Sequence, residues 1–171
     1  MKRAVIVVDM LNDFTLDDAP LKVDENKKII PNIRELIDNA RSIGDSIIYV
    51  CDSHQENDKE FEIWPKHCVK GTKGAEIVSE LKPLDNDFIV NKTTYDGFYN
   101  TVLHSLLSNL NINEIKICGC VSNICILHTA SSAVLRGYKV EIPVNCIASL
   151  DEYSKEYAIN HFRNVLNITL I

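Results

Sequence analysis

No segment of this 171-residue sequence approaches the ~20 consecutive apolar residues that a membrane-spanning helix requires. The N-terminus begins with basic residues and then turns apolar, but the apolar run covers only residues 4–8 and ends at Asp9. This run is too short for the apolar core of a secretory signal peptide, and no cleavage site follows it. We therefore expect a cytoplasmic protein that does not associate with a membrane.

The sequence also lacks any cluster of positive charge. Its 18 Lys and Arg residues are scattered and are outnumbered by 24 Asp and Glu residues, so the formal net charge is −6. A protein with this charge has little attraction for the phosphate backbone of a nucleic acid, which we exclude as a partner. The motifs G-x-G-x-x-G, the Walker phosphate loop, H-E-x-x-H and G-x-S-x-G are absent as well.

Cysteine, by contrast, is frequent, with residues Cys51, Cys68, Cys118, Cys120, Cys125 and Cys146. A chain of this length without a signal segment is expected in a reducing compartment, where these thiols stay free. Most of them should be small, buried hydrophobic residues. A metal cluster of Cys118, Cys120 and Cys125 is disfavoured, because the C-x-x-C spacing and a second ligand pair are both missing.

Short β-branched apolar runs alternate along the chain with stretches whose apolar residues recur at helical spacing. We predict strands at residues 4–8, 47–51, 88–91, 114–118, 139–144 and 168–171, and helices at residues 29–40, 74–81, 101–110, 122–136 and 151–166. This alternation predicts one α/β domain over residues 1–171, with a mostly parallel, six-stranded, Rossmann-like sheet between two helical layers. The segment 52–73 has no clear element, and a loop of that length is usually functional.

Chemically useful residues follow four of the predicted strands. Asp9 follows the first strand, Asp52 and His54 the second, Lys92 the third, and the fourth leads through Gly119 toward Cys125. Because the carboxyl ends of parallel strands meet at one edge of a sheet, we expect an acid, a base and a thiol to converge there. Cys125 lies near the start of a predicted helix, where backbone N–H groups and the helix dipole favour a thiolate. Cys120 is its main rival as nucleophile.

A second constellation joins Asp52 and His54 to the segment WPKH, which ends at His67. Carboxylate and imidazole groups are ligands of Zn, Fe and Mn, so this spacing indicates a divalent metal site. His128 is three residues beyond Cys125, and we interpret it as a packing residue.

Three segments resemble the signatures of isochorismatase-like cysteine hydrolases: VDMLNDF at 8–14, Lys92 ahead of TTYDGFYNT, and GCVSNICILHTA at 119–130. The resemblance extends over essentially the full chain. It implies the isochorismatase-like fold and a catalytic triad of Asp9, Lys92 and Cys125. It also implies an oxyanion hole made by the backbone N–H groups of Val121 and Cys125, beside a cis peptide bond between Cys120 and Val121.

Within that family, this chain resembles the nicotinamidase branch in three segments: DSH at 52–54, WPKHCVKGTKGAE at 64–76 and DGF at 96–98. This resemblance implies hydrolysis of nicotinamide to nicotinate and ammonia through a cysteine thioester. It further implies a divalent metal, with Zn ahead of Fe or Mn, on Asp52, His54 and His67, with Glu60 as a further ligand. Phe14, Trp64 and Cys120 would contact the substrate.

Two departures from the branch pattern leave other functions open. The segment QENDKEFEI is short, and Asp96 stands where the branch usually has serine. A related amidohydrolase for a ureido compound or another small amide would use the same triad. A non-catalytic binding domain and a thiol redox sensor are the remaining alternatives. Because the family is commonly oligomeric, we also expect a homo-oligomer.

Overall fold

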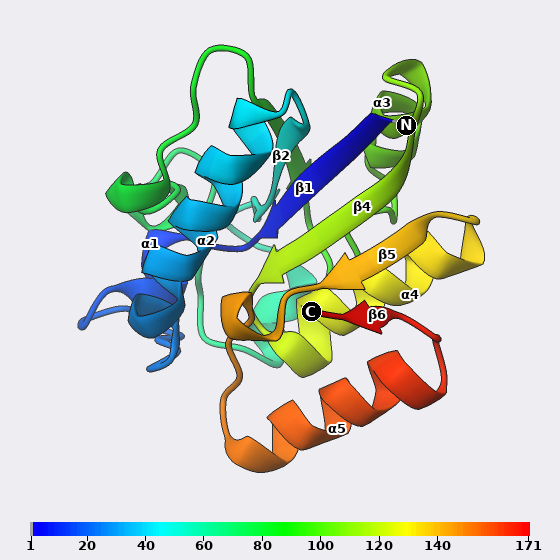
Figure 1. Cartoon of the computed structure of the whole chain (residues 1–171). Helices are drawn as coiled ribbons and strands as arrows, with labels where there is room; N and C mark the ends of the chain where they lie inside the picture. The colour runs from blue at the N-terminus through cyan, green and yellow to red at the C-terminus, as the bar shows by residue number, and fades with distance from the viewer. Residues whose placement is uncertain (1) are drawn as a thin grey trace.

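The computed structural model describes residues 2–171, which form one six-stranded sheet with the strand order β3-β2-β1-β4-β5-β6 (Figure 1). Each neighbouring pair of strands is parallel. The strands are β1 (Lys2–Val8), β2 (Ser46–Asp52), β3 (Phe88–Lys92), β4 (Ile112–Gly119), β5 (Lys139–Ile142) and β6 (Thr169–Leu170). The expected α/β fold is confirmed, and its sheet is fully parallel.

The chain reverses its direction of winding between β1 and β4. From β1 it proceeds to β2 and β3 on one side, and it then returns to β4 on the other side of β1. The long backbone pairing of β1 with β4 runs from Lys2 opposite Ile112 to Val8 opposite Gly119. Open parallel sheets bind ligands outside the carboxyl ends of the strands at such a reversal. The fold therefore directs attention to the residues that follow Val8 and Gly119.

The two faces of the sheet are covered by different helices (Figure 1). Val5 and Val7 of β1 face α2 (Asn26–Ser42), while Ala4, Ile6 and Val8 face the opposite side. That side is covered by α3 (Leu103–Asn109), α4 (Leu127–Leu135) and α5 (Glu152–Asn164). Because side chains alternate along a strand, a strand buried on both faces must be apolar throughout, as β1 is.

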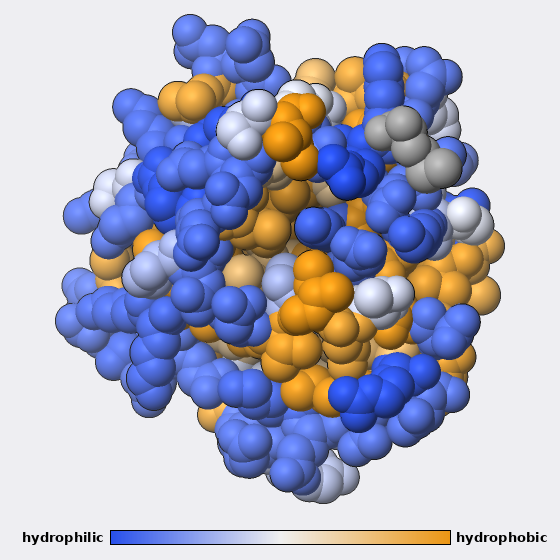
Figure 2. Space-filling model, viewed as in Figure 1, coloured by the Kyte–Doolittle hydropathy of each residue, from blue (hydrophilic) through white to orange (hydrophobic). Residues whose placement is uncertain are grey.

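Beyond α2, the same face of β4 and β5 is covered by charged pairs and not by a helix. Lys139 lies 2.9 Å from Glu114, and Lys116 lies 3.7 Å from Glu141, each across the two neighbouring strands. Figure 2 shows the same side of the molecule, where hydrophilic residues surround a central group of hydrophobic ones. These charged pairs lie on the part of the face that α2 does not cover.

One predicted helix is wrong. Residues 74–81 form two short 3₁₀ turns, Lys73–Ala75 and Ser79–Leu81, with an extended stretch between them. In that stretch Glu76 accepts the N–H of Asn12, and Val78 donates its N–H to Met10. The backbone thus pairs with the segment after β1, and this tertiary pairing outweighs local helical preference.

Other boundaries differ less. A one-turn helix, α1 (Asn12–Thr15), was not predicted, and the long segment after β2 contains a 3₁₀ turn, Lys59–Glu62. The helix predicted from residue 122 begins as a π-helical turn, Ser122–Ile126, before α4. A last 3₁₀ turn, Val144–Cys146, follows β5. Among residues 2–171, no helix combines the length and the apolar character that crossing a bilayer demands.

Candidate active site

A buried lysine joins the acid and the thiol that the strand ends deliver. Lys92 is the last residue of β3 and is almost fully buried. Its Nζ lies 2.7 Å from Oδ2 of Asp9 and 3.6 Å from Sγ of Cys125, and it also forms an ion pair with Asp52. The structure therefore brings the three predicted triad residues together around one ammonium group.

Asp9 is held by the backbone as well as by Lys92. Its Oδ1 accepts the N–H of Asp52 at 2.8 Å, and its own backbone has a φ of 52°, in the left-handed region. Burial and the negative charge of Asp52 raise the pKa of Asp9 to about 6, although Lys92 lowers it. At neutral pH this carboxyl group is therefore mostly ionised, and it can accept a proton.

Cys125 lies in the π-helical turn before α4 and is buried. Burial raises the pKa of its thiol well above the ordinary range, and this effect exceeds the lowering caused by Lys92. The expectation that the helix terminus favours a thiolate is therefore wrong for this site, because desolvation dominates. The proton stays on sulfur until a base removes it.

The rival thiol, Cys120, is engaged by the surrounding structure. Its Sγ donates to the backbone oxygen of Asp9 at 3.1 Å and lies 3.3 Å from the side-chain amide of Asn26. Its backbone N–H donates to Val8 at 3.0 Å.

The expected cis peptide bond between Cys120 and Val121 is present. Two backbone N–H groups after this bond already have hydrogen-bond partners: that of Ser122 donates to the oxygen of Ala148, and that of Ile124 donates to the oxygen of Val121.

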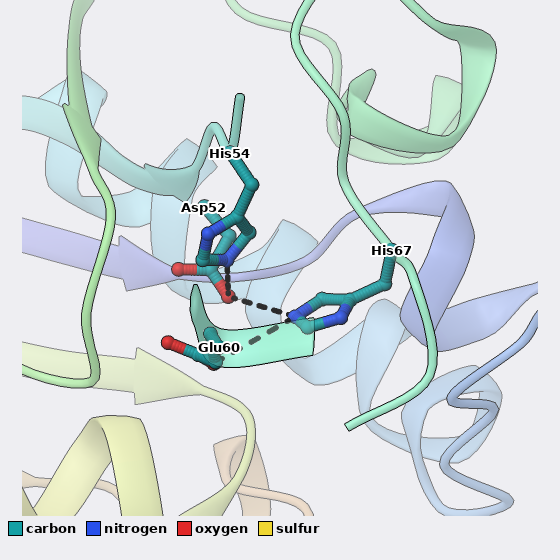
Figure 3. A group of neighbouring side chains, drawn as sticks. All are labelled: Asp52, His54, Glu60 and His67. Carbon is teal, nitrogen blue, oxygen red and sulfur yellow. Dashed lines mark ion pairs between the residues drawn. The ribbon is translucent and has the colours of Figure 1, made fainter. Parts of the chain in front are cut away.

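Next to the triad, four side chains that could ligate a metal converge (Figure 3). They are Asp52, His54, Glu60 and His67, and one ligand atom of each lies within 4.8 Å of the others. Oδ2 of Asp52 is 3.7 Å from Nε2 of His54 and 3.8 Å from Nε2 of His67. Oε1 of Glu60 is 3.9 Å from Nε2 of His67. The cluster includes Glu60 together with the three expected ligands.

The chemistry of this group fits a divalent cation. Both ring nitrogens of His54 are buried without a hydrogen-bond partner among residues 2–171, and Nδ1 of His67 lies 2.7 Å from the oxygen of Pro65. Both imidazoles thus direct Nε2 toward the carboxylates. Burial and the charge of Asp52 raise the pKa of Glu60 to about 6. Ligand atoms at about 2.1 Å from one zinc ion lie about 3–4 Å apart, which agrees with the separations here.

The thiol and the metal-ligating groups open into one cavity of about 220 Å³. Asp9, Cys125, Asp52, Glu60 and His67 all line it. The expected substrate contacts Phe14, Trp64 and Cys120 also line it. Further lining residues, which the sequence did not single out, are Val23, Tyr95, Ile124 and Leu150. A cavity of about 150 Å³ holds benzene, so this volume suits one aromatic ring with a small substituent.

Tyr95 is the residue that sequence reasoning missed most clearly. Its hydroxyl accepts the indole N–H of Trp64 at 3.0 Å, and its ring stacks on His128 with the centroids 5.8 Å apart. The signal available for Tyr95 was its place three residues after Lys92. His128 is exposed and does not line the cavity, so its predicted packing role is limited to the stack on Tyr95.

Asp96, which stands in the place of a serine, does not line the cavity. One carboxylate oxygen accepts the N–H of Phe98 at 2.8 Å, and the other accepts the hydroxyl of Ser132 on α4 at 2.5 Å. Asp96 therefore closes its own turn and fastens it to the helix. Asp96 thus contributes to the structure of the turn and not to the lining of the cavity.

The chain thus combines a fully parallel α/β fold with an acid, a lysine and a thiol that converge at the carboxyl ends of its strands. The chain matches the isochorismatase domain over residues 3–170, and it belongs to this family. It is 34% identical to the isochorismatase family protein YaaI of Bacillus subtilis, over 96% of this chain and 90% of that protein. It is 30% identical to the ureidoacrylate amidohydrolase RutB of Acinetobacter baylyi, over 75% of this chain and 63% of that protein.

Solved structures agree with this assignment. Nicotinamidase/pyrazinamidase PncA of Bacillus subtilis is 30% identical with a TM-score of 0.94, over 99% of both chains. The zinc complex of pyrazinamidase from Pyrococcus horikoshii is 30% identical with a TM-score of 0.94, over 100% of this chain and 99% of that one. N-carbamoylsarcosine amidase of Thermoplasma acidophilum is 33% identical with a TM-score of 0.90, over 99% and 95%.

Proposed function

We propose that this protein is a metal-dependent nicotinamidase, which hydrolyses nicotinamide to nicotinate and ammonia. The observation that carries the proposal is the single cavity that exposes both the Cys125 thiol and the cluster of Asp52, Glu60 and His67. A pyridine carboxamide has one nitrogen suited to a metal and one carbon suited to a thiol. The similarity to nicotinamidases supports the same substrate, although ureido-compound hydrolases are equally similar.

In this mechanism Asp9 is the general base and Cys125 is the nucleophile. Asp9 takes the thiol proton, and the sulfur attacks the carboxamide carbon. Lys92 stabilises the charges that Asp9 and Cys125 carry in turn, since it contacts both. Asp9 then gives its proton to the leaving ammonia, and a thioester remains on Cys125. Water activated by Asp9 hydrolyses this thioester and frees the thiol.

The oxyanion of the tetrahedral intermediate needs preorganised donors, each usually worth about 3 kcal/mol. We assign this role to the backbone N–H groups of Val121 and Cys125. Phe14 and Trp64 would hold the substrate ring, and Cys120 would contact it beside the cis peptide bond. Asp52, His54, Glu60 and His67 would hold the metal, which supplies a Lewis acid for the pyridine nitrogen and so orients the ring.

The test is ammonia release from nicotinamide by the purified, zinc-loaded protein. Cys125→Ala should abolish turnover. Cys120→Ala removes the rival thiol from the same cavity. Because Cys120 would also contact the substrate ring, this variant should raise KM but retain turnover at saturating nicotinamide. If the wild-type protein releases no ammonia from nicotinamide, the proposed substrate is wrong. If Cys120→Ala is inactive while Cys125→Ala is active, the nucleophile assignment is wrong.

A second candidate is a ureido compound that carries a carboxylate. The observation that favours it is Lys22, whose side chain lines the same cavity and is paired with Asp24 at 2.9 Å and with Asp17 at 3.3 Å. These partners are exposed, and exposed ion pairs contribute about 0–1 kcal/mol, so the amine can exchange them for a substrate carboxylate. Turnover of carbamoylated amino acids in place of nicotinamide would select this candidate.

A further inference from the structure

We propose that Asp58 is a positioning residue for the metal centre and that it holds two of the ligands, His54 and Glu60, with its two carboxylate oxygens. This inference rests on the metal site of the proposed function. It concerns metal affinity, which is measured without nicotinamide, so either proposal can fail without the other.

The first oxygen of Asp58 faces His54. Oδ2 of Asp58 lies 3.1 Å from Nδ1 of the imidazole, an ion-pair contact that is not aligned as a hydrogen bond, and the His54 side chain is fully buried. The other ring nitrogen, Nε2, points toward Asp52 (Figure 3). A carboxylate on one nitrogen of a metal-ligating histidine fixes the tautomer and the ring orientation. Asp58 therefore leaves the lone pair of His54 on Nε2, where the metal cluster is.

The second oxygen of Asp58 holds the turn that carries Glu60. Oδ1 of Asp58 accepts the backbone N–H of Glu60 at 2.9 Å, and Asp58 is the N-cap of the 3₁₀ turn Lys59–Glu62. A turn of four residues has few internal hydrogen bonds, so its cap determines whether it forms. This cap places Glu60 with its carboxylate 3.9 Å from Nε2 of His67.

No other residue of the cluster region makes this double contact. Glu56, two residues earlier, pairs with Lys66 at the surface, and its side chain is 69% exposed. The side chain of Asp58 is only 19% exposed. Glu56 is thus a matched control, because its removal deletes one negative charge from the same loop without touching a metal ligand.

The two contacts can be separated by substitution. Asp58→Ala removes both, whereas Asp58→Ser keeps the cap, because serine is a good N-cap residue, and loses the contact with His54. Zinc affinity is measured on the full chain by competition with a chelator. The visible spectrum of the cobalt-substituted protein reports the ligand geometry, and circular dichroism reports folding.

We expect Asp58→Ala to weaken zinc binding about 10–100-fold, as is typical for the loss of a residue that orients metal ligands. Glu56→Ala should stay within about twofold of the wild type, since exposed charges act weakly. Asp58→Ser should bind zinc more tightly than Asp58→Ala but more weakly than the wild type. The advantage of Asp58→Ser over Asp58→Ala should vanish when Glu60 is also replaced by alanine, because the cap acts through Glu60.

Zinc binding by Asp58→Ala that equals that of Glu56→Ala would overturn the proposal. Equal affinities of Asp58→Ser and Asp58→Ala would overturn the part that concerns Glu60. Should Asp58→Ala fail to fold, Asp58→Asn takes its place, because asparagine caps the turn and removes the carboxylate from His54. Unchanged zinc affinity and an unchanged cobalt spectrum in Asp58→Asn would then refute the role toward His54.

Discussion

Gly119, next to the candidate site, is a position where the addition of a single methyl group should strongly lower the free energy of unfolding. It ends β4 with a φ of 116°, and a Cβ built there would lie 2.0 Å from the backbone oxygen of Val8. That oxygen belongs to the central strand and accepts the N–H of Cys120, so it has no free direction in which to move. Gly119→Ala therefore imposes backbone strain and a steric clash at once.

The two contributions can be estimated separately. A non-glycine residue in an unfavourable φ region costs about 1–3 kcal/mol. Overpacking a well-packed interior costs a further ~1–3 kcal/mol. Gly119→Ala should thus lower the free energy of unfolding by about 2–6 kcal/mol, out of the ~5–15 kcal/mol that is typical of a domain.

The assay is equilibrium unfolding in urea, with the midpoint and the slope compared with those of the wild type. Gly137→Ala is the matched control, because Gly137 has a φ of 85° but no heavy atom within 4 Å of the added Cβ. It should lose only the strain, about 1–3 kcal/mol. If the two variants are equally stable, the close approach of Gly119 to Val8 adds no cost and this reasoning is refuted.

Three further predictions concern charge. Because Asp9 must be ionised to act as a base and its pKa is raised to about 6, kcat/KM should fall about tenfold for each pH unit below about 6 in a pH profile. Lys92→Met should move this limb to higher pH and reduce turnover, because Lys92 lowers the pKa of Asp9; an unmoved limb would show that another group titrates. Asp87→Ala should lower the free energy of unfolding by about 2–4 kcal/mol, measured in urea, because the buried Asp87 carboxylate pairs with Arg41. Asp38→Ala removes a more exposed partner of Arg41, at 3.6 Å, and should cost under ~1 kcal/mol.

Much of the fold could be predicted because the strands carry their own signal. β1 is apolar at every position from Ala4 to Val8, and a short run of this kind that is rich in valine and isoleucine is typical of a strand buried on both faces. The convergence of Asp9, Lys92 and Asp52 followed from the same reasoning, since parallel strands deliver their carboxyl ends to one edge. Local pattern and topology were sufficient there.

The sequence failed where the deciding interaction is distant along the chain. Residues 74–81 look helical, but the backbone at Val78 donates to Met10, and no local rule contains that contact. The thiol of Cys125 looks activated by its helix, yet burial by neighbouring elements raises its pKa. Asp58 looks like an ordinary loop residue until the structure shows which two groups its oxygens meet.

The reversal between β1 and β4 divides the chemistry of this protein between two parts of the chain. Asp9, Asp52, His67 and Lys92 all belong to the part that ends with β3, whereas Cys125 belongs to the part that starts with β4. On the proposed mechanism, neither part can hydrolyse an amide alone, because one has the base and the other has the nucleophile. Cutting the chain between β3 and β4 would produce two inactive fragments. Activity regained on mixing them would show that the fragment with β1–β3 and the fragment with β4–β6 had paired again into one sheet.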